Sequence, residues 1–152
     1  MTKNSGIRDY QTMQIMSSKP EKLILMLYDG ALRFIQLSIK ALEQNDIEQA
    51  HKNLIKTQNI MIELMTSLNL DKGGEIAFNL FRIYEFMHFT LVQANVKKNP
   101  EPVRRISGQL KTIRDSWAQA MKNREMEKTN NHDKNNQSES DKKGKKNIEL
   151  TG

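Results

Sequence analysis

The clearest fold signal lies near the end of the chain, where residues 103–120 read VRRISGQLKTIRDSWAQA. Its apolar side chains are spaced alternately by three and four residues: Val103, Ile106, Leu110, Ile113, Trp117 and Ala120. This spacing places them on one face of an α-helix, whereas a half-buried strand would alternate at every second residue. The stretch therefore predicts an amphipathic helix with a single apolar seam.

Three more segments with helical spacing precede this one, and short polar breaks separate them. Ser18, Pro20 and Glu21 mark the first start, because Ser caps a helix, Pro suits its first turn and Glu three residues later completes a capping box. Asp46 and Gln49 form the next cap-like pair. The residues 71–74, which read DKGG, predict a turn between two helices. The four predicted helices span about residues 20–43, 46–68, 74–96 and 100–122.

Short connections between helices of similar length make neighbours antiparallel. No strand pattern competes, and seven Gly and three Pro among 152 residues are few for the many turns of a sandwich or barrel. The expected fold class is all-α, an antiparallel up-down four-helix bundle. A short N-terminal helical segment and a disordered C-terminal tail are expected to flank it.

The two ends of the chain are polar. Residues 1–17 form a lead that carries Ile7 and Tyr10, and residues 123–152 hold almost no apolar side chains. Such a tail cannot bury enough apolar area to offset its ordering entropy, so disorder is expected. Its lysines at 142–146 resemble a weak polyanion patch, but no aromatic residue is interleaved for base stacking, which favours a solvating tail. The predicted domains are 1–17, 18–122 and 123–152.

Composition and motifs argue against catalysis and cofactors. The chain has no Cys, which removes disulfides and thiolate metal sites. Two Glu-x-x-His pairs, Glu48/His51 and Glu85/His88, are predicted to lie roughly 15 Å apart along the bundle, too far to share a metal pair. No signal peptide or membrane span is evident, so a cytoplasmic protein without stable membrane insertion is expected. A binding module is preferred to an enzyme, with no metal and no cofactor.

The second and third predicted helices carry more apolar surface than one packing seam requires. Nine Met residues also favour an adaptable partner surface. One explanation is a homodimer seam, and another is a surface that binds an amphipathic helix of a partner. The candidate partner-binding residues are Ile7, Tyr10, Ile55, Ile60, Ile62, Leu64, Phe81 and Phe89, with internal packing as the alternative for each helical position.

Four blocks of this sequence resemble the flagellar export chaperone family FliS. They are residues 18–32 (SKPEKLILMLYDGAL), 58–64 (QNIMIEL), 73–80 (GGEIAFNL) and 110–117 (LKTIRDSW). The early Tyr10-Gln11 also fits, so the likeness covers about residues 7–121. The polar tail goes beyond what the family core requires.

The resemblance implies a helical bundle in the bacterial cytosol that binds the disordered C-terminal segment of flagellin. The client becomes helical on binding, which prevents premature polymerisation and keeps it competent for flagellar type III secretion. The N-terminal lead with Ile7 and Tyr10 can cover the same surface when no client is bound. The export gate and an anti-sigma factor or co-chaperone are further candidate partners; nucleic acid is not. The alternative is a helical homodimer or regulatory adaptor of flagellar assembly.

Overall fold

A computed structural model describes residues 20–149 of the chain, and the side chains of 21–142. Four helices account for these residues: α2 (Pro20–Glu43), α3 (Ile47–Ser67), α4 (Leu70–Lys97) and α5 (Pro100–Glu149). The chain divides after Ser116 into two units. The first contains α2, α3, α4 and the start of α5, and the second contains the rest of α5. The predicted N-terminal segment, with Ile7 and Tyr10, lies outside the described residues.

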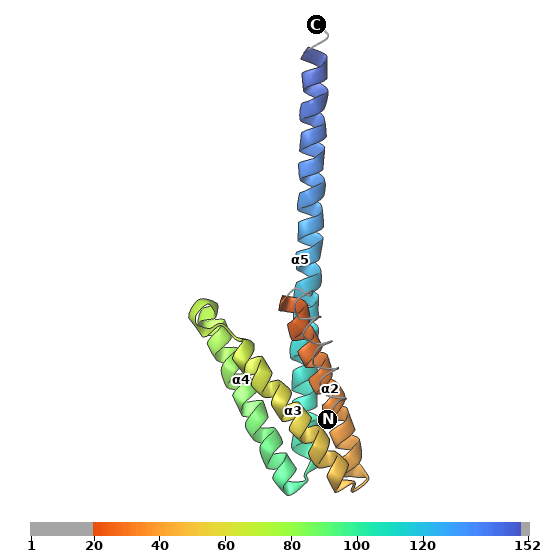
Figure 1. The fold of residues 1–152 in the computed structure, drawn as a ribbon, viewed down its shortest axis with the longest axis vertical. Coiled ribbons are helices and arrows are strands. Elements are labelled where there is room, and N and C mark those ends of the chain that lie inside the picture. Colours follow the sequence, from red (N-terminus) through yellow and green to blue (C-terminus); the bar gives the residue numbers. More distant parts are fainter. Residues whose placement is uncertain (1–19, 150–152) are drawn as a thin grey trace, which may run out of the picture. The chain divides into compact units, whose positions relative to one another are not determined.

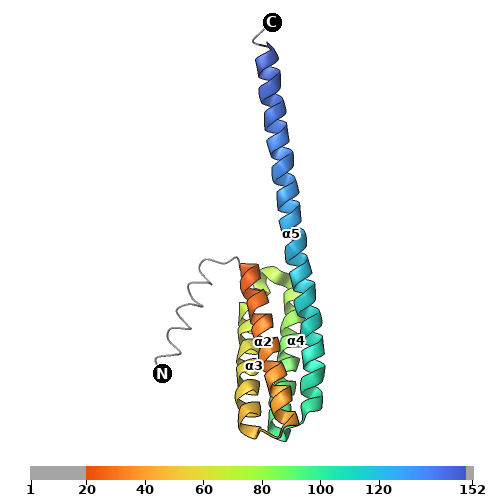
Figure 2. The same ribbon diagram turned by 90° about the vertical axis from the view of Figure 1, so that its right-hand side faces the viewer.

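The first unit is an antiparallel helical bundle. Following the colours in Figure 2, α2 descends, α3 ascends, α4 descends and the start of α5 ascends. Two-to-three-residue connections join these helices, so each turns back beside its predecessor. The expected all-α, up-down four-helix bundle is confirmed.

The helices begin and end where local chemistry satisfies their free backbone groups. The Asp46 side chain accepts a hydrogen bond from the backbone N–H of Gln49 at 3.2 Å, which is the cap predicted for the second helix. Asn45 and Lys98 adopt left-handed backbone conformations, with φ of 56° and 51°, where α2 and α4 end. The chain reverses direction at both places.

The start of α4 differs from the prediction. The sequence predicts a turn at residues 71–74, but α4 begins at Leu70. Its cap is Asn69, whose side chain accepts a hydrogen bond from the backbone N–H of Lys72 at 3.1 Å. The predicted break survives as a kink, because Gly74 has φ 57° and ψ −142° inside the helix. A capping Asn therefore allows one helical turn to form before the glycine interrupts it.

The bundle core combines aliphatic side chains with two tyrosines. Tyr28, Ile35 and Leu54 are buried on α2 and α3, and Met87 and Leu91 are buried on α4. The predicted seam of α5 is buried at Val103, Ile106 and Leu110, half-buried at Ile113 and exposed at Ala120. The fully buried part of the seam is therefore its first half, and Ile113 and Trp117 are half-buried.

The segment after residue 122 is helical as far as Glu149. It continues α5 to Glu149, and every side chain from Lys122 to Lys142 is exposed. Many of its residues, such as Lys, Glu and Gln, have good helix propensity. Lack of apolar side chains predicts that the segment buries no core, but it does not prevent backbone hydrogen bonds from forming a helix. This helix makes no apolar stripe of its own.

Candidate partner-binding surface

An apolar groove runs between α2 and α3. It has a volume of about 620 Å³, and its apolar lining comes from Leu23, Met26, Leu27, Gly30, Phe34 and Ile60. Polar residues also line it, namely Asp29, Arg33, Lys56, Asn59 and Glu63. A groove lined by both apolar and charged side chains can accept an amphipathic helix. We call this feature the α2–α3 groove.

Gly30 lies where the two helices of this groove approach closely. A Cβ atom at Gly30 would lie 3.4 Å from Cδ1 of Ile60. Any longer side chain at this position would project into the groove or push Ile60 aside. The absence of a side chain at Gly30 therefore helps to keep the groove open.

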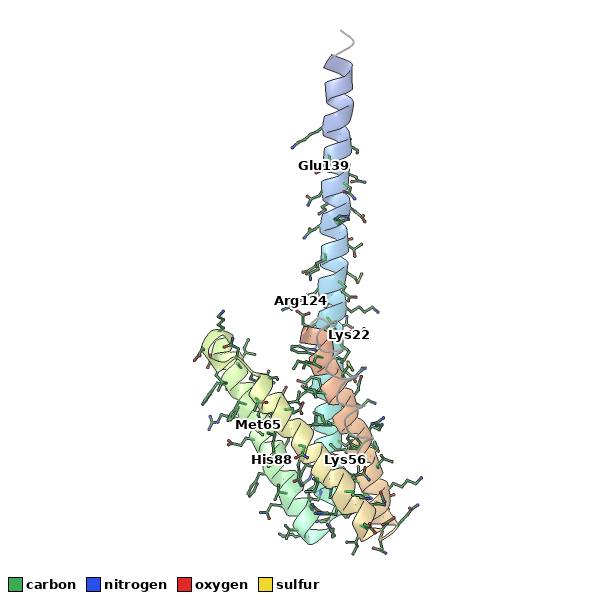
Figure 3. The ribbon with its side chains drawn as sticks, in the orientation of Figure 1. Lys22, Lys56, Met65, His88, Arg124 and Glu139 are labelled. Atoms are coloured by element: carbon green, nitrogen blue, oxygen red, sulfur yellow. The ribbon has the colours of Figure 1, made fainter. Side chains whose placement is uncertain are left out.

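Two cations surround the aromatic ring of Phe34. The Arg33 guanidinium lies 5.0 Å from the ring centroid, and the Lys56 ammonium lies 5.2 Å from it. In Figure 3, Lys56 lies where α3 runs beside α2. Such cation–π contacts hold both positive groups beside Phe34, which lines the groove.

Asp29 is tied to α5 by an ion pair. Its carboxylate accepts a hydrogen bond from Arg114 Nε at 2.8 Å, and this contact raises the pKa of the Arg114 guanidinium. Arg104 makes a similar bridge from α5 to Glu43, at 2.7 Å. Both pairs are solvent-exposed, so screening by water keeps their contribution to stability small. Arg114 of α5 therefore places a positive charge beside the Asp29 carboxylate.

A second apolar surface lies on α4. Phe86 and Phe89 are 61% and 59% exposed, and they line a groove of about 210 Å³ with Pro102 and Arg105 of α5. Phe78, further along α4, is 53% exposed and has the Arg82 guanidinium 5.7 Å from its ring centroid. Three exposed phenylalanines on one helix make α4 a second candidate surface for binding a partner.

The predicted binding residues fall into different places. Ile60 lines the α2–α3 groove, and Phe89 lines the groove between α4 and α5. Ile55 and Ile62 are 37% and 43% exposed on α3. Helical spacing puts them on the opposite flank of α3 from Ile60. Phe81 on α4 is half-buried.

Leu64 is a correction. Its exposed fraction is 0%, so it belongs to the buried core, as Leu54 and Met61 of the same helix do. The wide apolar arc of α3 predicts Leu64 on a flank, because periodicity does not reveal which edge of such an arc meets a neighbouring helix.

The prediction missed the contribution of α2 to the groove. Leu23, Met26 and Leu27 sit near its beginning, and Met26 is 38% exposed. The sequence does indicate this contribution, because the segment 20–43 is apolar around nearly its whole circumference.

The two Glu-x-x-His pairs do not converge. The Nδ1 atom of His51 lies 3.1 Å from the side-chain amide nitrogen of Asn95, so this ring joins α3 to α4. Across residues 20–142, no group of three or more His, Asp or Glu side chains is arranged to hold a metal ion. Within the helices that the structure describes, none is both long and apolar enough to span a membrane.

The family model for the flagellar protein FliS matches residues 3–124. The chain belongs to the FliS family. It is 38% identical to the flagellar secretion chaperone FliS of Bacillus subtilis over 112 residues, which is 74% of this chain and 83% of that protein. It is 36% identical to the Salmonella typhimurium flagellar secretion chaperone FliS over 120 residues, 76% of this chain and 89% of that one.

A solved structure shares the fold. The crystal structure of a bacterial flagellar chaperone matches with a TM-score of 0.65 and 21% sequence identity, covering 78% of this chain and 98% of that one. The match to FliS ends at residue 124, so the family accounts for the bundle and leaves most of the second unit outside the likeness.

Proposed function

We propose that this FliS-family chain is a flagellar export chaperone that binds the disordered C-terminal segment of flagellin. The observation that carries the proposal is the α2–α3 groove, which apolar and charged side chains line together on a member of this family. Its relatives from Bacillus subtilis and Salmonella typhimurium bear the name flagellar secretion chaperone. The chaperone acts in the bacterial cytosol, before the client reaches the flagellar export gate.

The physical mechanism is coupled folding and binding. A disordered client loses conformational entropy when it becomes helical, so it needs a long apolar track to offset that loss. The groove supplies part of the track through Leu23, Leu27 and Ile60. Burial of the client's apolar face then masks the surface by which it would polymerise.

The remaining exposed apolar residues extend the track beyond one groove. Ile55 and Ile62 on α3, with Phe81 and Phe89 on α4, offer a second stretch for a client that wraps around the bundle. The N-terminal lead, through Ile7 and Tyr10, covers part of this surface before the client binds. An anti-sigma factor or co-chaperone would bind surface that the client leaves open.

The test is a calorimetric titration with a peptide of the flagellin C-terminal segment, followed in parallel by circular dichroism. We expect a 1:1 complex with gained helicity and a negative heat-capacity change. Light scattering at rising protein concentration tests the alternative of a homodimer. The homodimer would be favoured over the chaperone proposal if the protein dimerised with rising concentration and bound no peptide at tens of micromolar.

A further inference from the structure

The groove between α4 and α5 combines an apolar lining with positive charge. Phe86 and Phe89 line it from α4, and Pro102 lines it from α5. Its charged lining residues are Lys97 of α4 and Arg105 of α5, and no acidic side chain in the described part of the chain lines it. We call this feature the α4–α5 groove.

Both cations of the α4–α5 groove are available to a ligand. Among the side chains of residues 21–142, neither Lys97 nor Arg105 forms an ion pair, and both are exposed. The neighbouring Arg104, by contrast, is bridged to Glu43 and to Glu101. The positive charge that faces the groove is therefore not compensated from within the bundle, which favours an anionic occupant.

The size of the groove favours a protein side chain over a cofactor or metabolite. Its volume of about 210 Å³ lies below the roughly 300–1,000 Å³ that is usual for small-molecule sites. Phe86 and Phe89 are 61% and 59% exposed, so an apolar side chain that packs on them removes a large apolar area from water. An apolar anchor surrounded by charged contacts is the usual arrangement at the centre of a protein–protein interface.

The α4–α5 groove lies on the edge of the bundle opposite the α2–α3 groove. The helix α2 packs beside α3 and is joined to α5 by the Asp29–Arg114 ion pair. The helix α3 in turn is joined to α4 by the hydrogen bond between His51 and Asn95. The order around the bundle is therefore α5, α2, α3, α4, and a partner between α4 and α5 leaves the α2–α3 groove open.

We infer that the α4–α5 groove binds an acidic segment of a second protein. An apolar side chain of that segment packs on Phe86 and Phe89, and its carboxylates pair with Lys97 and Arg105. Carboxylates suit these positions because they form charge-assisted hydrogen bonds with guanidinium and ammonium groups. The inference goes beyond the proposed function, since it assigns a different groove to a partner other than flagellin.

The charge of the chain argues against an occupant from the protein itself. Residues 1–19 contain three basic side chains and one acidic side chain, a net charge of +2. A second copy of the chain carries a net charge of +6. Like charges repel across an interface, so both are poorer matches to two uncompensated cations than an acidic segment is.

The first test maps the binding of three short peptides on the isotope-labelled full-length protein by NMR. The acidic probe has the sequence DELFDE, the basic probe is KKLFKK, and DEGGDE lacks the apolar centre. DELFDE should shift the backbone signals of Phe86, Phe89 and Arg105 and leave those of Leu27 and Ile60 in the α2–α3 groove unchanged. At low salt, KKLFKK and DEGGDE should each bind about tenfold more weakly or worse, because one repels the cations and the other buries no apolar side chain.

Charge exchange provides the second test. Lys97→Glu combined with Arg105→Glu should reverse the preference, so that KKLFKK binds more tightly than DELFDE. The matched control is Lys52→Glu combined with Lys111→Glu, which changes the net charge equally at exposed positions that line neither groove. This control should keep the preference for DELFDE. Both preferences should shrink at high salt.

Several results would overturn the inference. They are no signal shift with millimolar DELFDE, equal binding of DELFDE and KKLFKK, shifts centred on the α2–α3 groove, or the same reversal of preference in the control variant. Circular dichroism checks that each variant is folded. Since none of these measurements uses flagellin, they test the α4–α5 groove separately from the proposed function.

Discussion

The hydroxyl groups of Tyr28 and Tyr84 hydrogen-bond to each other inside the bundle and join α2 to α4. The two side chains are only 1% and 2% exposed, and their ring centroids lie 6.4 Å apart with the planes tilted by 52°. Burial raises the pKa of both phenols; for Tyr84 the bond to Tyr28 raises it further. Each tyrosine fills core volume while supplying a polar partner for the other.

Replacing one of these tyrosines should cost more than replacing both. Tyr28→Phe leaves the Tyr84 hydroxyl buried without this partner, which should lower the free energy of unfolding by about 1–3 kcal/mol. The double variant Tyr28→Phe/Tyr84→Phe removes both polar groups and should be clearly less destabilised than the sum of the single variants. Urea denaturation of all four proteins measures the coupling. Additive losses would show that the hydroxyls do not depend on each other.

The tyrosine pair also predicts loss of stability in alkali. The pKa of both phenols is raised in the folded state above the ordinary value of 10.0, so above about pH 10 the unfolded chain releases protons that the folded chain retains. The free energy of unfolding should then fall as pH rises. Denaturation at pH 8 and at pH 11 measures this loss, which should be smaller in the double Phe variant. An equal loss in both proteins would assign it to other groups.

Ile62 and Leu64 should separate binding from stability. Ile62 is 43% exposed and Leu64 is 0% exposed, although both belong to the apolar arc of α3. Ile62→Asp should change the free energy of unfolding by about 1 kcal/mol or less and lower the affinity for the flagellin peptide. Leu64→Ala should cost about 2–5 kcal/mol through a core cavity. Thermal melts and peptide titrations measure both effects. Unfolding of the bundle by Ile62→Asp would contradict the assignment of Ile62 to the surface.

Gly30 and Gly108 form a matched pair for testing the groove. Both lie within helices, but a Cβ at Gly30 would meet Ile60, whereas one at Gly108 would meet nothing within 4 Å. Gly30→Leu should fill the groove and weaken the peptide more than tenfold, because the client loses the burial of about one apolar side chain. Gly108→Leu should leave affinity unchanged and add up to about 1 kcal/mol of stability. Equal affinities for the two variants would place the client elsewhere.

The two glycines at the start of α4 should resist substitution for different reasons. Gly74 has φ 57° and ψ −142°, a region that is nearly closed to other residues, so Gly74→Ala should cost about 1–3 kcal/mol. At Gly73 a new Cβ would collide with Cβ of Ala77, so Gly73→Ala should also destabilise. Gly108→Ala, which meets no neighbour, is the control and should stabilise. Chemical denaturation ranks the three variants, and a neutral Gly74→Ala would argue against the kink.

Removal of residues 125–152 should leave the bundle intact. The side chains from Lys122 to Lys142 are exposed, and the family match ends at residue 124. The melting temperature and the affinity for the flagellin peptide should therefore stay the same, while the helical circular dichroism signal falls by the contribution of the lost helix. A large drop in melting temperature would show that this segment stabilises the protein.

Much of the bundle could be read from spacing and caps. The break at 44–45, the Asp46 cap and the range 20–43 for the first helix follow from capping residues and a short polar break, and the structure has the same features. The Asn69 cap was missed because the DKGG signal two residues later was stronger. The helix at 123–149 depends on backbone propensity, which the lack of apolar side chains in this segment does not address.

The sequence by itself therefore determined the class of fold, the helix boundaries to within a few residues and the family, because these depend on periodicity, capping and short motifs along the chain. The tertiary structure alone decided which part of a wide apolar arc becomes core. Leu64 packs inside while Ile62 stays exposed, and Gly30 brings α2 close enough to Ile60 to form a groove. The reason is physical: periodicity gives the direction of a side chain from its own helix axis, whereas burial depends on which neighbouring helix lies in that direction.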